Sequence, residues 1–177
     1  GYLPQDVALM DGTVAENISR FDPTADSLEI IAAAQTAGVH ELILRLPFGY
    51  ETPLGAGGSA LSAGQRQRIA LARAIYRRPF LVVLDEPNSN LDAEGETALT
   101  EAIATLRELG SIVVVIAHRP SALAAVDCVG VMQSGKLVAF GAKDDVIAAQ
   151  TVPPKPRVTA VSSQRPAAAR MAMGDAS

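Results

Sequence analysis

Apolar residues recur at helical spacing through the first part of the chain, which predicts three short helices and a longer one after them. The expected helices cover residues 13–19, 27–37, 39–46 and 64–77. A segment rich in glycine and proline, from Pro47 to Ser62, precedes the last of them and is expected to be a loop. Together these segments predict a helical subdomain of about residues 13–78.

After residue 78 the pattern changes to short aliphatic runs. Phe80–Leu84 and Ser111–Ala117 are continuous apolar runs typical of strands buried on both faces, and Ala93–Leu109 between them has helical periodicity. A strand, a helix and a strand in succession predict a parallel sheet with a crossover connection. Shorter strands at 129–133 and 137–140, a turn at 134–135 and a helix at 143–149 would complete a core of about residues 79–149.

Composition limits the classes of protein to which the chain can belong. With 177 residues and 49% hydrophobic content, it is long enough for one packed domain, for which we predict residues 1–149. Residues 150–177 lack apolar periodicity and are rich in Pro, Ala, Ser and Arg, so we predict a disordered tail. The 15 basic and 19 acidic residues form no basic stripe, and the net charge of -4 argues against a nucleic-acid partner.

Several smaller features bear on the setting of the protein. No apolar run reaches about 18 residues, the length needed to span a bilayer. Cys128 is the single cysteine, so it cannot form an internal disulfide, and we predict a small buried side chain. Asn17 heads a formal glycosylation sequence, N-I-S, which is expected to be accidental. The chain begins with glycine rather than methionine, so we expect it to be cut from a longer protein.

The strongest chemical signal is the acidic pair Asp85-Glu86, which directly follows the strand predicted at Phe80–Leu84. Ligands of open parallel sheets bind beyond the carboxyl ends of the strands, so both carboxylates are expected to reach such a site. One carboxylate could hold a magnesium ion that also binds phosphates and water, while the other carboxylate could polarise an attacking water. The alternative is that an acidic residue here merely begins a turn.

Three further positions could complete the site. Ser62 precedes the helix that opens at Gly64, where free backbone N–H groups could bind an anion, although a serine there is also an ordinary N-cap. Asp92 lies in S-N-L-D after the acidic pair, and His118 follows the second strand at the same expected sheet edge. A single histidine after a strand is more often structural than catalytic.

The order of these motifs resembles the nucleotide-binding domain of ABC transporter ATPases. The match covers about residues 1–149 and consists, in order, of a glutamine, L-S-A-G-Q, four aliphatic residues with D-E, S-N-L-D and a histidine. The resemblance implies an α/β fold, a partial P-loop NTPase with a parallel sheet core and a helical subdomain, and ATP with Mg²⁺ as ligands. In this family the Walker A portion, the phosphate loop, precedes the glutamine, so it is missing here and expected before Gly1.

The resemblance also implies a role for each matching residue. Gln5 would be the Q-loop glutamine that senses magnesium and the attacking water, Asp85 the magnesium ligand, Glu86 the catalytic base, Asp92 the D-loop aspartate and His118 the switch histidine that contacts the γ-phosphate. The signature motif, which contacts nucleotide, would comprise Leu61, Ser62, Ala63, Gly64 and Gln65. Ala63 stands where many relatives have glycine, and Asn88 replaces a commoner small residue; neither departure removes a charged group.

Longer stretches resemble the ATPase subunits of bacterial type I protein secretion systems, among them G-Y-L-P-Q-D-V-A-L-M-D-G-T-V-A-E-N-I and D-E-P-N-S-N-L-D. This resemblance implies a motor domain at the cytoplasmic face of the bacterial inner membrane. Its partners would be a transmembrane domain of the same or a partner chain and a second copy in a homodimer through the ATPase domain. A periplasmic adaptor and an outer-membrane channel are implied as further partners.

The run Gly130–Leu137, G-V-M-Q-S-G-K-L, nearly spells the phosphate loop G-x-x-x-x-G-K-[ST]. Leu137 supplies no hydroxyl for magnesium, and an apolar run follows instead of the helix that would bind phosphate. We therefore predict a hairpin turn at Gly135. Because a phosphate-loop strand is missing, the sheet around Leu81–Leu84 and Ile112–Ile116 is expected to have an uncovered apolar edge.

Two other functions stay open from the sequence. The segment Thr13–Leu46 with Gln5 could be a docking module for a membrane domain, without catalysis. A soluble ABC ATPase that acts on DNA or ribosomes is the other alternative. The acidic balance and the exporter-like loop before Leu61 count against it.

Overall fold

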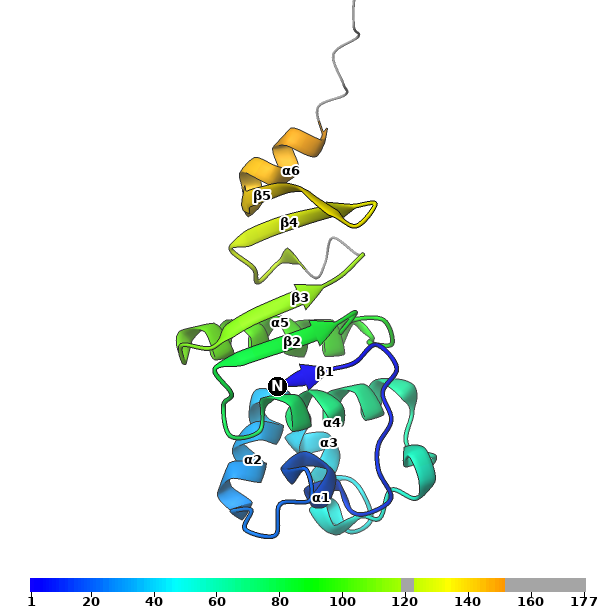
Figure 1. Ribbon diagram of the computed structural model, residues 1–177. Helices are drawn as coiled ribbons and strands as arrows, with labels where there is room; N and C mark the ends of the chain where they lie inside the picture. The colour runs from blue at the N-terminus through cyan, green and yellow to red at the C-terminus, as the bar shows by residue number, and fades with distance from the viewer. Residues whose placement is uncertain (119–122, 152–177) are drawn as a thin grey trace, which may run out of the picture.

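Figure 1 shows the computed structural model, which describes residues 1–118 and 123–151. The helices are α1 (Val14–Ser19), α2 (Ser27–Thr36), α3 (His40–Leu44), α4 (Ala63–Ile75), α5 (Ala93–Glu108) and α6 (Lys143–Thr151). The strands are β1 (Tyr2–Leu3), β2 (Leu81–Asp85), β3 (Ile112–Ile116), β4 (Cys128–Gln133) and β5 (Lys136–Ala142). Two short 3₁₀ helices, η1 (Gly49–Glu51) and η2 (Ala56–Gly58), lie in the segment predicted as a loop. Within the described ranges no helix has the length and apolar character needed to cross a membrane.

A parallel sheet with the strand order β1-β2-β3 lies at the centre of the fold. In the ladder between β2 and β3, Leu81 lies opposite Ile112 and Asp85 lies opposite Ile116. The connecting helix α5 contacts β3, while α4 contacts β1 (Figure 1). The predicted crossover between parallel strands and the α/β fold class are thereby confirmed.

The strand β1 was not predicted from the sequence pattern. It consists only of Tyr2 and Leu3, which is too short to show an apolar period. It is a strand because Tyr2 pairs with Val83 and the fully buried Leu3 pairs with Leu84. This pairing brings the residues that follow β1 to the edge of the sheet where β2 ends.

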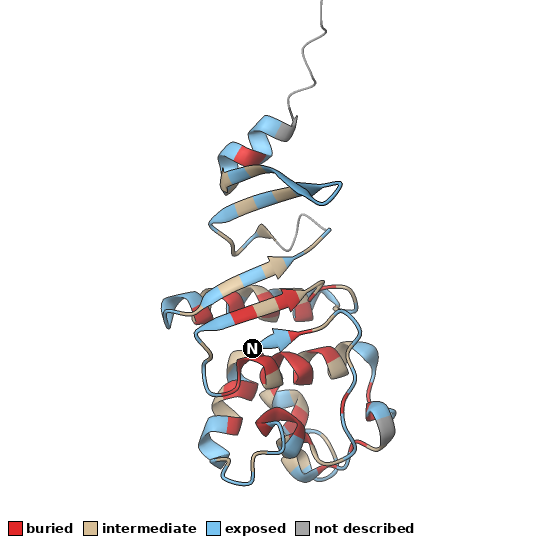
Figure 2. Ribbon diagram, in the orientation of Figure 1, coloured by how far each residue is buried: buried red, intermediate tan, exposed pale blue. Residues whose placement is uncertain are grey.

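One hydrophobic core joins the helices to the sheet. Its most deeply buried side chains come from α1, α4, β2 and α5, which carry red segments in Figure 2, and include Ile18, Ile69, Leu84 and Leu106. Burying one such side chain contributes roughly 1.5–3 kcal/mol relative to leaving it in water. Since α4 contacts α1, α2 and β1, this helix is the element through which the helical part and the sheet share their core.

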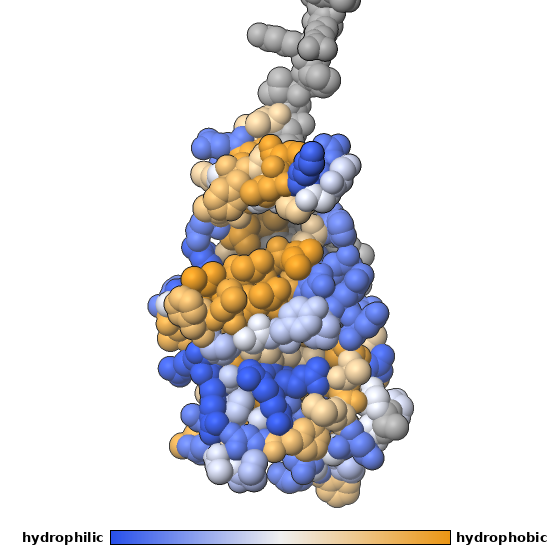
Figure 3. Space-filling view, in the orientation of Figure 1, coloured by the Kyte–Doolittle hydropathy of each residue, from blue (hydrophilic) through white to orange (hydrophobic). Residues whose placement is uncertain are grey.

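One face of β3 is apolar and exposed. Ile112, Val114 and Ile116 are 50%, 43% and 46% exposed, whereas Val113 and Val115 pack against the core. Figure 3 shows the resulting apolar patch over this part of the sheet. Among the described residues β3 pairs only with β2, so the predicted uncovered edge is present at β3. The uncovered edge belongs to β3, since β2 lies between β1 and β3.

The strands β4 and β5 form an antiparallel hairpin beyond β3, at the end of the molecule away from α1–α3 (Figure 1). Gln133 pairs with Lys136, and between them Ser134 and Gly135 have φ angles of 49° and 74°. Positive φ at both central residues is the conformation of a type I′ turn. The predicted hairpin turn is confirmed, and the run Gly130–Leu137 is not a phosphate loop.

Two details at this end of the molecule differ from the prediction. Cys128 is exposed rather than buried, because it begins a hairpin of only two strands that covers little of each strand. The helix α6 continues to Thr151 rather than ending at Ala149. From residue 152 onward, the predicted disordered tail lies outside the described residues.

The fully buried side chain of Asn17 in α1 holds the chain that precedes this helix. Its Oδ1 accepts a hydrogen bond from the Met10 N–H at 2.9 Å. Its Nδ2 donates to the carbonyl oxygens of Met10 and Thr13, at 3.0 Å in each case. A glycan could not be attached to an amide enclosed in this way, which agrees with the expectation that N-I-S is accidental.

Replacing Asn17 with alanine is expected to lower the free energy of unfolding by about 1–3 kcal/mol, because it leaves partly buried backbone groups without partners. Urea denaturation of the 177-residue chain measures this change. Glu41→Gln serves as the control, since Glu41 is exposed and its substitution should change stability by less than about 0.5 kcal/mol. Equal stability of the Asn17→Ala chain and the control would contradict the prediction.

Candidate functional site

The acidic pair lies at the carboxyl end of β2, as predicted. Asp85 is the last residue of β2, and Glu86 follows it with a φ angle of 46°, in the left-handed region that non-glycine residues rarely adopt. The Glu86 N–H donates to the Ile116 carbonyl at 2.8 Å, and the Ser89 N–H donates to the Glu86 carbonyl at 3.2 Å. The chain therefore turns sharply at Glu86, with its backbone bonded to the end of β3.

The structure brings His118 to this pair. Its Nε2 lies 3.2 Å from Oε1 of Glu86, and the two side chains are 82% and 26% exposed. The contact follows from the sheet, because Ile116 ends β3 directly opposite Asp85, and His118 comes shortly after it. The residues predicted as base and switch histidine, which are far apart in the sequence, are thus in contact at one sheet edge.

Gln5 lies at the same edge, and in the described part of the chain no hydrogen bond joins it to the acidic pair. It follows β1, where Leu3 pairs with Leu84, so the parallel register carries it past the end of β2. Its side chain is exposed, and within the described residues it makes no hydrogen bond. The parallel register thus brings Gln5 to the sheet edge where the acidic pair lies.

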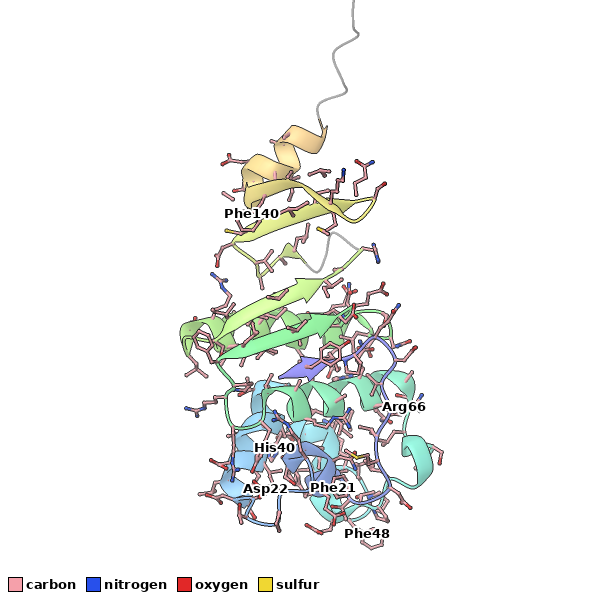
Figure 4. All side chains as sticks on the ribbon, in the orientation of Figure 1. Phe21, Asp22, His40, Phe48, Arg66 and Phe140 are labelled. Carbon is pink, nitrogen blue, oxygen red and sulfur yellow. The ribbon has the colours of Figure 1, made fainter. Side chains whose placement is uncertain are left out.

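The predicted signature segment begins α4. Ser62 is the N-cap: its Oγ accepts from the Gln65 N–H at 3.2 Å, and the Gln65 Oε1 accepts from the Ser62 N–H at 2.9 Å. This is a capping box, so the ordinary N-cap interpretation of Ser62 holds in this structure. Leu61 is buried, and its carbonyl accepts a hydrogen bond at 2.7 Å from Arg66, which Figure 4 labels at this end of α4.

The first turn of α4 packs closely against the S-N-L-D segment. A Cβ atom on Gly64 would lie 2.8 Å from the Asn90 carbonyl oxygen, so only glycine fits here without movement. Asp92 is the N-cap of α5, with its Oδ1 accepting from the Gly95 N–H at 2.8 Å. Arg68 of α4 also lies 3.6 Å from the Asp92 carboxylate. The signature segment and the predicted D-loop aspartate therefore belong to one packed seam between two helices.

Sequence reasoning missed Gln67, which lies behind the acidic pair. Its side chain is only 2% exposed, and its Nε2 donates to the carbonyl oxygens of Glu86 and Pro87. The signal was available in the sequence, because Gln67 is in line with Leu71 and Ala74 on the buried face of α4. A polar residue at a core position of a helix needs a buried partner.

The residues at this sheet edge suit a metal ion that binds together with substrate phosphates. Among residues 1–118 and 123–151, no group of three or more His, Cys, Asp or Glu side chains is placed to hold a metal ion. Mg²⁺ is commonly held by one or two carboxylates together with substrate phosphates, and the single half-buried carboxylate of Asp85 fits that arrangement. The chain lacks a complete motif for binding these phosphates, since its sequence contains no full G-x-x-x-x-G-K-[ST] run.

Comparison with known proteins identifies relatives of this chain. The family described as ABC transporter matches residues 1–89. The type I secretion system ATP-binding protein PrsD of Rhizobium meliloti is 65% identical over 147 residues, which are 83% of this chain and 25% of PrsD. The cyclolysin secretion/processing ATP-binding protein CyaB of Bordetella pertussis is 41% identical over 149 residues, which are 84% of this chain and 21% of CyaB. The chain thus spans about a quarter of the length of these relatives, or less.

A solved structure also resembles the fold. A bacterial Atm1-family ABC exporter with ATP bound superposes with a TM-score of 0.74 and is 31% identical. The match covers 88% of this chain and 29% of the exporter chain. It agrees with the partial P-loop NTPase fold expected from the order of the motifs.

The close approach of α4 to Asn90 predicts the effect of a methyl group at Gly64. Alanine normally stabilises a helix by about 1 kcal/mol relative to glycine. Here the clash should reverse the sign, and Gly64→Ala is expected to lower the free energy of unfolding by about 1–3 kcal/mol. Glu101→Ala in α5, at an exposed helical position, is the control and should change stability little. Denaturation by urea distinguishes the two, and a stabilised Gly64→Ala chain would refute the close packing.

Proposed function

Because this chain belongs to the ABC transporter family, we propose that it is part of the ATP-hydrolysing motor domain of an exporter, and that this exporter is a type I protein secretion system. The observation that carries the proposal is the meeting of Asp85, Glu86 and His118 at the carboxyl edge of β2 and β3. The similarity to PrsD and CyaB, whose names describe secretion, supports the kind of exporter.

Each site residue has a proposed role. Asp85 would hold Mg²⁺, and Glu86 would take a proton from the attacking water. The contact with His118 orients the Glu86 carboxylate, and Gln5, which follows β1 at the same sheet edge, would sense Mg²⁺ and the attacking water. Mg-ATP, when bound, supplies the phosphoryl group that water attacks and the cation that offsets its charge.

A second subunit completes the proposed site. The chain's own signature segment, Leu61–Gln65, opens the helix α4. The capping box uses the N–H groups of Ser62 and Gln65, and the N–H groups of Ala63 and Gly64 at the start of the helix suit phosphate. We propose that this segment serves the nucleotide of a partner subunit in a homodimer, together with Asp92. A transmembrane domain of the same or a partner chain, a periplasmic adaptor and an outer-membrane channel are the further proposed partners, at the cytoplasmic face of the inner membrane. The acidic balance of the sequence supports no nucleic-acid partner.

The proposed organisation divides residues 1–149 into a helical subdomain, about 13–78, and a core, about 79–149, which carries the acidic pair and His118. The shared hydrophobic core, which extends to Ala125, supports regarding the helical subdomain and the sheet β1-β2-β3 as one unit. Exposed apolar side chains on the helical part favour a docking role for Thr13–Leu46 as well. Leu44 and nearby Phe48 are 54% and 69% exposed, and Figure 4 shows Phe48 at the end of the molecule opposite Phe140.

The 177-residue chain by itself is expected not to hydrolyse ATP, since its sequence has no complete phosphate loop to hold the nucleotide. A phosphate-release assay on the purified chain with Mg-ATP tests this expectation. Steady turnover that Glu86→Gln abolishes would show that the chain needs no further segment.

In a complete transporter subunit that contains this segment, Glu86→Gln is expected to reduce the hydrolysis rate by about 100-fold or more, because the amide cannot take the proton from water. Binding of Mg-ATP should persist, since the amide keeps the size of the side chain. Equilibrium nucleotide binding and steady-state ATPase assays measure the two effects. The exposed residue of α5 gives the matched control, Glu101→Gln, which should keep full activity.

A further inference from the structure

Glu86 is held in a strained backbone conformation. Its φ of 46° lies in the left-handed region, which is unfavourable for a side chain with a Cβ and persists only where surrounding contacts impose it. Two of these contacts are backbone hydrogen bonds, from the Glu86 N–H to Ile116 and from the Ser89 N–H to the Glu86 carbonyl. The side chain of Gln67 supplies the others.

Gln67 reaches this turn from the neighbouring helix. Its Nε2 lies 3.3 Å from the Glu86 carbonyl oxygen and 2.5 Å from the Pro87 carbonyl oxygen. Both partners are acceptors, so the amide must present its nitrogen to them, and the orientation of the side chain is thereby determined. One side chain thus clamps two successive carbonyl groups of the turn.

The other end of the same amide is unsatisfied. Gln67 Oε1 is buried and has no hydrogen-bond partner among the described residues. A buried acceptor without a partner is costly, and an apolar side chain of similar length would avoid that cost. The advantage of glutamine over an apolar side chain at this position is therefore its amide nitrogen, which donates the two hydrogen bonds.

The helix that carries Gln67 is the one that begins with the signature segment. Ser62 caps α4, and Gln67 lies in the next turn of the same rigid helix. The adjacent Arg68, whose side chain is 12% exposed, lies 3.3 Å from Glu94 near the start of α5. Both ends of the segment between β2 and α5 are thus attached to α4.

We propose that Gln67 is a positioning residue that holds the turn at Glu86 and Pro87, and so aims the Glu86 carboxylate, while linking it to the signature end of α4. Gln67 does not touch the reacting atoms; it acts through the backbone of Glu86. This inference rests on the proposed role of Glu86 in hydrolysis. It adds a residue whose amide joins the turn that carries the base to the helix that carries the signature segment.

The first test measures hydrolysis in the complete transporter subunit that contains this segment. Gln67→Met keeps the length and packing of the side chain and removes both hydrogen bonds. It is expected to lower kcat by about 10- to 100-fold, the scale of misplacing a reacting group, and to leave the KM for ATP within about twofold. Leu106→Ala, a variant near the end of α5 that removes most of a buried side chain, controls for general loss of stability and should keep kcat.

A double variant separates positioning from a merely structural effect. If Gln67 acts only through Glu86, adding Gln67→Met to Glu86→Gln should leave the residual rate unchanged within about twofold. A further tenfold loss in the double variant would show that Gln67 acts elsewhere and would overturn the inference. A kcat of Gln67→Met equal to that of the unaltered subunit, with Glu86→Gln inactive, would overturn it while leaving the proposed function intact. Hydrolysis that does not depend on Glu86 would instead reject the proposed function.

The second test needs no nucleotide and uses the 177-residue chain itself. Amide hydrogen exchange at Ser89, whose N–H bonds the Glu86 carbonyl, is expected to become about tenfold faster in Gln67→Met, and exchange at Glu86 should increase with it. Should Gln67→Met fail to fold, Gln67→Leu is the second variant, since it is close in volume, removes both hydrogen bonds and brings no charge into the buried site. Unchanged exchange at both amides in the folded variant would overturn the inference.

Discussion

The register of β2 against β3 is the constraint on which the rest of the site depends. Asp85 lies opposite Ile116, and the Ile116 carbonyl accepts the N–H of Glu86. Because side chains alternate along a strand, a shift of one residue in this ladder would turn Asp85 to the other side of the sheet and separate Glu86 from His118. The contact between a base and a histidine distant in sequence is thus a consequence of backbone pairing, which the crossover through α5 maintains.

The helix α4 is the second element on which the site depends, because its buried face and its first turn make different contacts. Its buried side chains, such as Ile69, join the helical part to the sheet, and its first turn packs on Asn90 so closely that Gly64 cannot be larger. Between these two regions Gln67 and Arg68 attach the segment that carries the acidic pair. Geometry at the signature end and geometry at Glu86 are therefore not independent, since a rigid helix connects them.

The exposed side of β3 shows where this fold lacks cover. Ile112, Val114 and Ile116 alternate with apolar side chains that pack against the core. Apolar residues on both faces are typical of a strand that is buried on both sides. Apolar surface left in water forgoes about 25 cal/mol for each Å² that would otherwise be buried. The patch in Figure 3 is therefore a surface on which further protein is expected to pack, and it limits the stability of these residues by themselves.

The sequence alone determined most of the helices, the parallel crossover, the hairpin turn at Ser134-Gly135 and the location of the acidic pair after β2. These features depend on local periodicity and turn chemistry, which neighbouring residues decide. The sequence could not reveal β1, the exposure of Cys128 or the hydrogen-bond partners of Gln67. β1 needs the pairing of Leu3 with Leu84, and Cys128 is exposed because its hairpin has only two strands. The partners of Gln67 are two carbonyl groups on another segment of the chain. Tertiary structure decided all three features, because each depends on how separate parts of the chain come together.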